Sequence, residues 1–194
     1  MHARLPASPV AYGTNFESRN KSNSMDVRLQ IASDNDLEQI VAFVRAYHAF
    51  EGIEDADDIS ATIRPLLGNS RYGRVWFIYA ESLLVGYVAV CFGYSIEFAG
   101  PDAFIDEMFI VPEQRGKGIG RSVLRLLKPE AAALGLKVLH LEVARTNEHA
   151  RRLYASAGFR SRERFFLMSS ETPGENRLDH RASVNATSAQ KSNE

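Results

Sequence analysis

Cysteine is nearly absent from this chain, since Cys91 carries the single thiol among 194 residues. One cysteine excludes an intrachain disulfide and a metal site built from several thiolates. Cys91 lies inside an apolar run without a neighbour suited to activate it, so we expect a buried and unreactive side chain. A reducing, cytoplasmic location is compatible with this composition, and we expect it.

Long apolar runs are also missing, because no stretch reaches the roughly 18 consecutive apolar residues that a membrane-spanning helix requires. Charge of one sign is equally scarce, and the formal net charge is -1. A chain so nearly neutral lacks the basic surface typical of proteins that bind nucleic acids. We therefore expect neither a membrane nor a nucleic acid as a partner.

Polar residues dominate both ends of the chain. Residues 1–24 contain Ser, Asn and Pro but no apolar segment like that of a secretory signal, so we expect a disordered leader, with Met25 as an alternative start. Residues 169–194 are similarly polar and predict a disordered tail. Residues 25–168 are long and apolar enough to form one domain around one core.

Strand and helix patterns alternate between these tails. Runs of β-branched and aromatic residues predict strands at 27–32, 75–80, 84–94, from 104, at 138–143 and at 164–168. Apolar residues at helical spacing predict helices at 34–50, 57–67, from 119 and from 148. We expect Ser33 or Asp34 to begin the first helix and Gly52 to end it. Pro129 should kink or break the third.

The most informative segment, residues 104–121, is an apolar strand pattern that leads through a basic glycine loop into a helix. Glycines lack the β-carbon that would keep a ligand away from the backbone, and three stand here: Gly116, Gly118 and Gly120. The first turn of the helix leaves backbone N–H groups that attract an anion. Three cations add charge: Arg115, Lys117 and Arg121. This segment predicts a phosphate-binding site.

The spacing of this segment excludes one known phosphate-binding motif, the P-loop, and argues against a second, the dinucleotide fingerprint. A P-loop needs Gly-Lys followed by Ser or Thr, but Lys117 is followed by Gly118. A dinucleotide fingerprint needs a glycine where Arg121 stands, and it needs the loop directly after a strand. The pattern that remains is R-x-x-G-x-G, formed by Arg115, Gly118 and Gly120.

With this pattern the chain resembles the GCN5-related N-acetyltransferase (GNAT) family. A second block supports the resemblance, namely residues 139–147 followed by Ala150, Leu153, Tyr154, Gly158 and Phe159. The likeness runs from about Met25 to Met168. It implies a mixed α/β fold with a mostly antiparallel central sheet of about seven strands flanked by about four helices.

The resemblance also implies acetyl-CoA as a co-substrate and no metal. In this family the strand before the glycine loop pairs with the pantetheine arm, and the loop holds the pyrophosphate. The residues implied for this binding are Phe109, Ile110, Val111, Arg115, Gly116, Lys117, Gly118, Ile119, Gly120, Arg121 and Asn147. Asn147 can in addition cap the helix that starts at Glu148.

Acetyl transfer to an amine needs a group that takes the amine's proton and a group that protonates the leaving thiolate. The resemblance points to Tyr154 as the acid; the alternative is a packed aromatic residue. Glu107 and Glu142 are both candidates for the base, and the sequence does not choose between them. We expect His48 to be a surface or packed histidine rather than a catalyst.

The resemblance places the acceptor beside the first two helices, and it implies contacts from Tyr47, Phe50, Glu51, Tyr94 and Glu97. Carboxylates beside aromatic rings suit a cationic amine, although a solvated acidic loop is the alternative. We expect transfer to a primary amine of a small molecule or peptide, and a homodimer is left open. The alternatives are a coenzyme-A-binding regulatory module without turnover and, third, a dinucleotide oxidoreductase.

Overall fold

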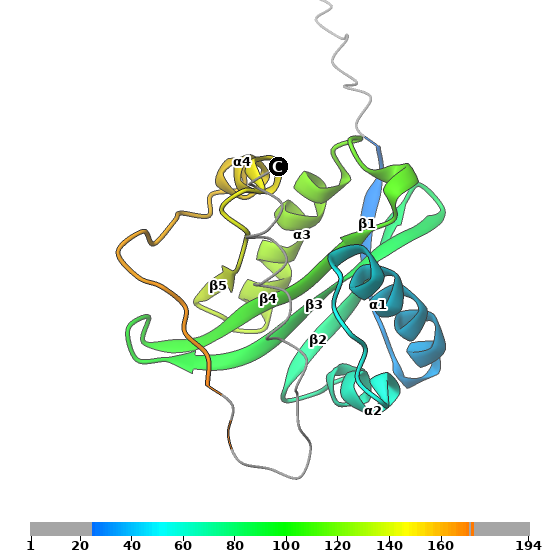
Figure 1. Cartoon of the computed structure of the whole chain (residues 1–194), viewed down its shortest axis with the longest axis horizontal. Coiled ribbons are helices and arrows are strands. Elements are labelled where there is room, and N and C mark those ends of the chain that lie inside the picture. The colour runs from blue at the N-terminus through cyan, green and yellow to red at the C-terminus, as the bar shows by residue number, and fades with distance from the viewer. Residues whose placement is uncertain (1–24, 171, 173–194) are drawn as a thin grey trace, which may run out of the picture.

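The computed structural model describes residues 25–170 and 172, so the predicted leader and most of the predicted tail lie outside it. In the described part, one sheet has the strand order β1-β2-β3-β4-β5 (Figure 1). Its strands are β1 (Val27–Ile31), β2 (Gly73–Ala80), β3 (Leu83–Ser95), β4 (Gly100–Ile110) and β5 (Val138–Leu141). Neighbours are antiparallel except β4 and β5, which are parallel.

The mixed α/β class and the mostly antiparallel sheet are as predicted, although the described residues form fewer strands than the predicted number of about seven. The described residues form five strands, and the predicted strand at 164–168 is absent from them. β5 has four residues and offers few ladder bonds to a further strand. Instead, Arg145 lies over the ring of Phe166 in this segment, and Arg162, just before it, pairs with Glu97.

Four α-helices accompany the described sheet: α1 (Leu37–Glu51), α2 (Ile59–Ile63), α3 (Ile119–Ala133) and α4 (Glu148–Ser156). The helical segment starts after Ser33, as predicted, but its first residues form a 3-10 turn (Asp34–Asp36) with a capping box of Ser33 and Asp36, and α1 follows at Leu37. Gly52 ends α1, as predicted, with a φ of 71°. α2 is shorter than predicted. Pro65 has no N–H to donate, and the chain continues as a 3-10 turn over Arg64–Leu66.

Pro129 does not break α3, so the predicted break is wrong; the helix runs through this residue to Ala133, and a kink there stays a prediction. Proline removes the hydrogen bond to the carbonyl four residues earlier, which belongs to Arg125. Arg125 and Pro129 both lie on the exposed face of the helix, where water can satisfy that carbonyl. The buried face, with Val123, Leu124 and Leu127, is uninterrupted.

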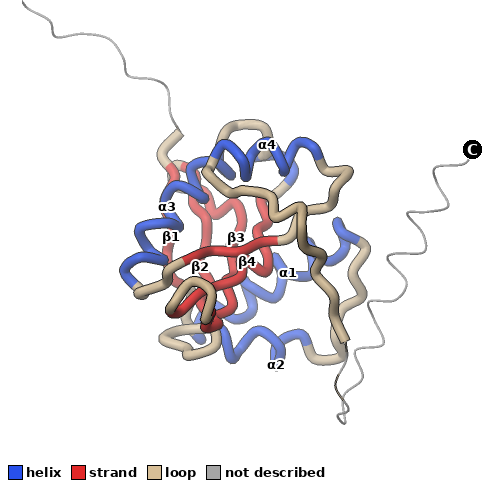
Figure 2. The backbone as a smooth tube through the Cα atoms, turned by 90° about the vertical axis from the view of Figure 1, so that its left-hand side faces the viewer, coloured by secondary structure: helices blue, strands red, loops and turns tan. Residues whose placement is uncertain are grey.

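Helices cover both faces of the sheet (Figures 1 and 2). α1 and α2 pack on one face, over a core that includes Phe77, Tyr87 and Phe109. α3 and α4 pack on the other, over a core that includes Trp76 and Ile105. β4 contributes side chains to both cores. No described helix is long and apolar enough to cross a membrane.

Candidate active site

The second half of β4 is paired on one side only. β3 accompanies β4 from Gly100 to Ile110, whereas β5 pairs only with residues 102–105. Beyond that point no described strand lies against the outer edge of residues 106–110, which we call the open edge of β4. Unpaired strand edges are templates for an extended chain or ligand.

A β-bulge lies where the open edge begins. The ladder pairs Val90 with Ile105 and Ala89 with Glu107, so Asp106 is an extra residue in β4. Ile105 belongs to the core under α3, whereas Glu107 contacts α1 on the opposite face. Bulges are known to redirect side chains next to active sites. This one turns Glu107 towards α1.

Glu107 is held by two residues and linked to a third. The Tyr87 hydroxyl donates to its Oε2 at 2.5 Å, and His48 Nε2 lies 3.1 Å from its Oε1. The other ring nitrogen of His48, Nδ1, lies 2.7 Å from Asp55 Oδ1. The result is a continuous chain of polar groups, Asp55–His48–Glu107–Tyr87, which starts at a surface loop and ends in the core.

Two tyrosines beside Glu107 are kept in their protonated form. Burial raises the pKa of Tyr87 above 10.0, and the charge of Glu107 with its hydrogen bond raises it further. Burial likewise raises the pKa of Tyr47, followed by the charges of Glu51 and Glu107. At neutral pH the Tyr87 hydroxyl therefore remains a donor to Glu107.

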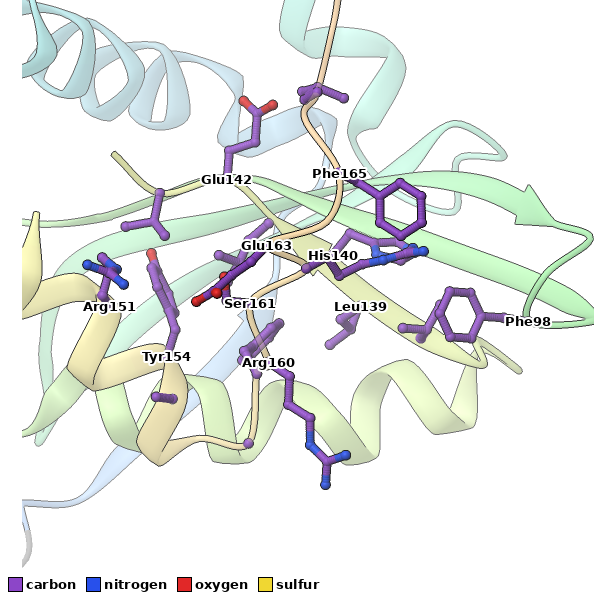
Figure 3. A pocket seen from close by; sticks show the side chains of 18 of the residues that line it. Phe98, Leu139, His140, Glu142, Arg151, Tyr154, Arg160, Ser161, Glu163 and Phe165 are labelled. Atoms are coloured by element: carbon purple, nitrogen blue, oxygen red, sulfur yellow. The ribbon is translucent and has the colours of Figure 1, made fainter. Parts of the chain in front are cut away.

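Tyr154 lies on α4 and faces a groove that β5, α4 and residues 158–167 line (Figure 3). Its ring is half-buried and packs edge-on against Phe159, with 5.9 Å between the ring centroids. Burial raises the pKa of Tyr154, and the charge of Glu51 adds to this effect. A phenol that keeps its proton can donate it to a leaving group.

The glycine loop has the backbone shape that the sequence implies. Gly116 and Gly118 have φ angles of 76° and 81°, and a β-carbon on either would meet no atom within 4 Å. Gly118 caps α3 without any side-chain hydrogen bond, so no side chain competes for the first N–H groups of the helix. Gly120 has another role: a β-carbon there would lie 3.1 Å from Leu153 of α4.

The predicted cations of this loop are exposed, and two have contacts within the protein. Arg115 donates from Nε to the Ile110 carbonyl at 2.8 Å, and its guanidinium lies 4.1 Å from the centroid of the Phe50 ring. Lys117 donates to the side chain of Gln114 at 2.8 Å. Open space, free N–H groups and positive charge together fit a phosphate group.

Other residues predicted to bind the cofactor differ in what they can offer. The side chains of Phe109 and Ile119 are buried in the two cores, so only their backbone groups can reach a ligand. Asn147 caps α4, since its side chain accepts from the Ala150 N–H at 3.0 Å. Ile110 and Val111 are half-buried at the end of the open edge.

The structure brings some predicted acceptor residues near Glu107 and leaves others apart. Tyr47 packs against Phe109, and Glu51 lies one helical turn further along α1. Tyr94 pairs with Pro101, six residues before Glu107 on β4, which corresponds to roughly 20 Å along a strand. Tyr94 is 74% exposed, and the neighbouring hairpin residue Glu97 pairs with Arg162.

Glu142 follows directly after β5 and is exposed. It lines a groove of about 1600 Å³ between β5, α4 and residues 158–167. Figure 3 shows its carboxylate pointing away from Tyr154. Of the two predicted bases, Glu107 is thus the one that other side chains orient.

The sequence did not identify three members of the polar chain. We expected a surface or packed histidine at position 48 and read Asp55 only as part of an acidic loop, and the sequence had no motif for Tyr87. His48 and Glu107 are 59 residues apart in the sequence. No local spacing could connect them, because the contact depends on the bulge and on the placement of α1. In the described residues no group of His, Cys, Asp and Glu is arranged to hold a metal ion.

The chain is similar to acetyltransferases in sequence and in fold. A model of the acetyltransferase (GNAT) family matches residues 37–159. An uncharacterized N-acetyltransferase of Archaeoglobus fulgidus is 33% identical over 144 residues, which cover 71% of this chain and 95% of that protein. A thialysine N-epsilon-acetyltransferase of Bos taurus is 27% identical over 145 residues, covering 68% and 83%. A predicted acetyltransferase from Clostridium acetobutylicum, solved with acetyl-CoA, matches with a TM-score of 0.60 and 20% identity over 74% of this chain and 96% of that chain.

Proposed function

Because the chain belongs to the acetyltransferase (GNAT) family and is an N-acetyltransferase, we propose that it transfers the acetyl group of acetyl-CoA directly to a primary amine. The observation that carries this proposal is the place of Glu107. It stands on the open edge of β4, a few residues before the glycine loop, with its carboxylate held by Tyr87 and His48. One strand thus carries a proton acceptor and leads into an anion site.

The open edge and the glycine loop fit the two ends of the donor. Amide groups of a pantetheine arm can pair with the outward-facing backbone groups of residues 106–109, since the Ile110 carbonyl already accepts from Arg115. The pyrophosphate can bind the free N–H groups at the start of α3, beside Lys117 and Arg121. When bound, acetyl-CoA supplies the activated acetyl thioester. The related Clostridium acetobutylicum protein, solved with acetyl-CoA, supports this choice of donor.

Glu107 is the base in this proposal. An ammonium group must lose a proton before its nitrogen can attack a thioester carbonyl. The Tyr87 hydroxyl fixes Oε2 of Glu107, and His48 lies at Oε1, so the carboxylate is oriented before the amine arrives. Glu142 is exposed, and its carboxylate points away from Tyr154.

Tyr154 is the acid in this proposal. It lies on α4, beyond the point where β5 stops pairing with β4. Its phenol retains its proton because burial raises its pKa. As the carbon–sulfur bond breaks, the thiolate needs a proton, and Tyr154 can donate it. The base and the acid then come from different elements that flank one opening.

The acceptor in this proposal is a small cationic amine. Negative charge gathers at the end of α1 and the start of the open edge, on Glu51, Asp55, Asp106 and Glu107. Tyr47 adds an aromatic face to this set. The relative that acts on thialysine, by its name, supports an acceptor with an amine on an aliphatic side chain.

The test is a turnover screen with acetyl-CoA over polyamines, lysine analogues such as thialysine, aminoglycosides and N-terminal peptides. Release of coenzyme A is followed with a thiol reagent, and the product mass is read directly. We expect a product heavier than its amine by one acetyl group, formed most efficiently from a small cationic amine. Saturable binding of acetyl-CoA without any product over the whole panel would contradict the proposed function.

A further inference from the structure

The acetylation of an ammonium group releases one net proton, and that proton must leave a half-buried site. The nitrogen loses two protons while one carbon–nitrogen bond forms and the carbon–sulfur bond breaks. One proton ends on the thiol of coenzyme A, and the other must reach water. We propose that His48 is the positioning residue that carries this second proton from Glu107 to Asp55 and so to solvent. The inference rests on the proposed function, with Glu107 as the base.

Glu107 and His48 are similarly buried, and Asp55 is the most exposed of the three groups. The side chain of Glu107 is 18% exposed and that of His48 is 15% exposed, whereas that of Asp55 is 39% exposed. The two gaps are within hydrogen-bonding distance, 3.1 Å on the Glu107 side and 2.7 Å on the Asp55 side. A proton on Glu107 therefore has a bonded path to a carboxylate at the surface.

The imidazole is suited to this task because each of its nitrogens faces a different carboxylate. Glu107 takes a proton from the ammonium group and donates it to Nε2 of His48. The proton on Nδ1 then passes to Asp55 and on to water, which leaves Glu107 ionised again and His48 with one proton, now on Nε2. Before the next turnover the ring returns to its starting tautomer by exchanging protons with water, one leaving Nε2 and one arriving at Nδ1. No bond other than those to hydrogen changes in this exit step, and no co-reactant is needed.

Tyr87 does not offer a competing exit. Its hydroxyl donates to the other oxygen of Glu107 from within the core, and its raised pKa keeps that proton in place. The charged and titratable groups around the path come from α1, the following loop, β3, β4 and α4. They are Arg45, Tyr47, Glu51, Asp55, Tyr87, Asp106, Glu107 and Tyr154.

The experiment measures kcat at low and high buffer concentration with an amine that the wild type acetylates. We expect His48→Ala to lose about 10- to 100-fold in kcat at low buffer, since a proton-transfer step becomes limiting. The KM for the amine and the Kd for acetyl-CoA should stay close to wild type. Added imidazole should restore kcat in a saturable way, because it can replace the missing ring; wild type should not respond.

Two further variants complete the design. Asp55→Asn keeps the His48 ring but removes the surface acceptor, so its smaller loss should disappear as buffer concentration rises. His149→Gln removes an exposed histidine of α4 and should leave kcat, its pH profile and the response to imidazole unchanged. Circular dichroism of each variant checks the fold.

Two results would overturn the relay. The first is a His48→Ala enzyme with wild-type kcat at low buffer. The second is a folded His48→Ala enzyme that binds acetyl-CoA normally, is slow, and gains nothing from imidazole, which would mean that the ring only packs. Lack of turnover in the wild type with every amine would contradict the proposed function, and the relay with it.

Discussion

Ile105 and Glu107 lie on opposite faces of the sheet although one residue separates them. In a regular strand, residues two apart share a face. The extra residue at Asp106 breaks this alternation, so that Ile105 packs under α3 and Glu107 meets His48 and Tyr87 on the α1 face. The position of the proposed base therefore depends on a single bulge.

The first prediction compares the two candidate bases. Glu107→Gln keeps the size of the side chain but removes the proton acceptor, so kcat should fall by about 10²- to 10⁴-fold. The Kd for acetyl-CoA, measured by calorimetry, should not change. Glu142→Gln should have a much smaller effect on kcat, because Glu142 is exposed and points away from Tyr154. The reverse order of the two losses would assign the base to Glu142.

The second prediction separates backbone strain from cofactor binding. Gly118 and Gly135 both have positive φ angles, 81° and 78°, with open space where a β-carbon would stand. An alanine at either position should cost about 1–2 kcal/mol of stability. Gly118→Ala should also weaken acetyl-CoA binding, because it disturbs the first N–H groups of α3. Gly135 follows the C-terminal end of α3, so Gly135→Ala is the control. Equal Kd values for acetyl-CoA in the two variants would exclude the glycine loop as the phosphate site.

The third prediction concerns stability at high pH. Because the pKa of Tyr87 is higher in the folded protein than its ordinary 10.0, the unfolded chain loses this proton first. The contribution to stability is complete below pH 10 and is lost as pH rises above it. Tyr87→Phe should thus be less stable than wild type at pH 8 by about 1–3 kcal/mol, and its Tm should decline less between pH 9 and 11.

Denaturant unfolding at each pH measures the difference in the free energy of unfolding, and thermal unfolding measures the change in Tm. Tyr94→Phe is the matched control, because it removes a phenol from a side chain that is 74% exposed. An equally steep loss of stability in wild type and Tyr87→Phe would show that the Tyr87 hydroxyl does not contribute in this way.

The fourth prediction concerns the single thiol. Burial raises the pKa of Cys91 from 9.0 to about 11, and the charges of Asp106 and Glu107 add to the shift. Since the thiolate is the reactive form, alkylation by iodoacetamide should rise with a midpoint near pH 11 in the folded protein. In urea the midpoint should return to near 9.0. Mass spectrometry gives both rates, and superimposable profiles would contradict the shift.

The fifth prediction tests the proline inside α3. Pro129→Ala restores a donor for the Arg125 carbonyl and should stabilise the protein by about 1–3 kcal/mol, since the helix already runs through this position. Leu126→Pro would be the opposite experiment, with a new proline on a half-buried position of the same helix, and should destabilise. Thermal unfolding measures both changes; a lower Tm for Pro129→Ala would mean that the proline supports the native helix.

Features that depend on near neighbours were predictable from the sequence. The capping box of Ser33 and Asp36 and the left-handed Gly52 involve contacts within a few residues, so the start of the 3-10 turn before α1 and the end of α1 could be placed in advance. The start of α4 after Asn147 was predictable for the same reason. The family resemblance and the class of fold followed from two local blocks of sequence.

Features that depend on distant partners were not predictable in this way. The apolar run from Phe165 resembles a strand, yet strand formation also needs a neighbour long enough to pair with it. Pro129 resembles a helix breaker until the exposed position of Arg125 is known. His48 became part of the site only through Glu107, which a bulge turned towards it.

The sheet has unpaired backbone groups at its two edge strands, β1 and β5, and also along the open edge of β4, inside the sheet. Unpaired edges of this kind invite pairing with other chains, and proteins usually cover them. On the proposed function, the donor covers this one by lying along it like a short extra strand. Bound acetyl-CoA would then protect the protein from aggregation through this edge, as well as supply the acetyl group. Protein purified without the ligand would be the form most prone to aggregate.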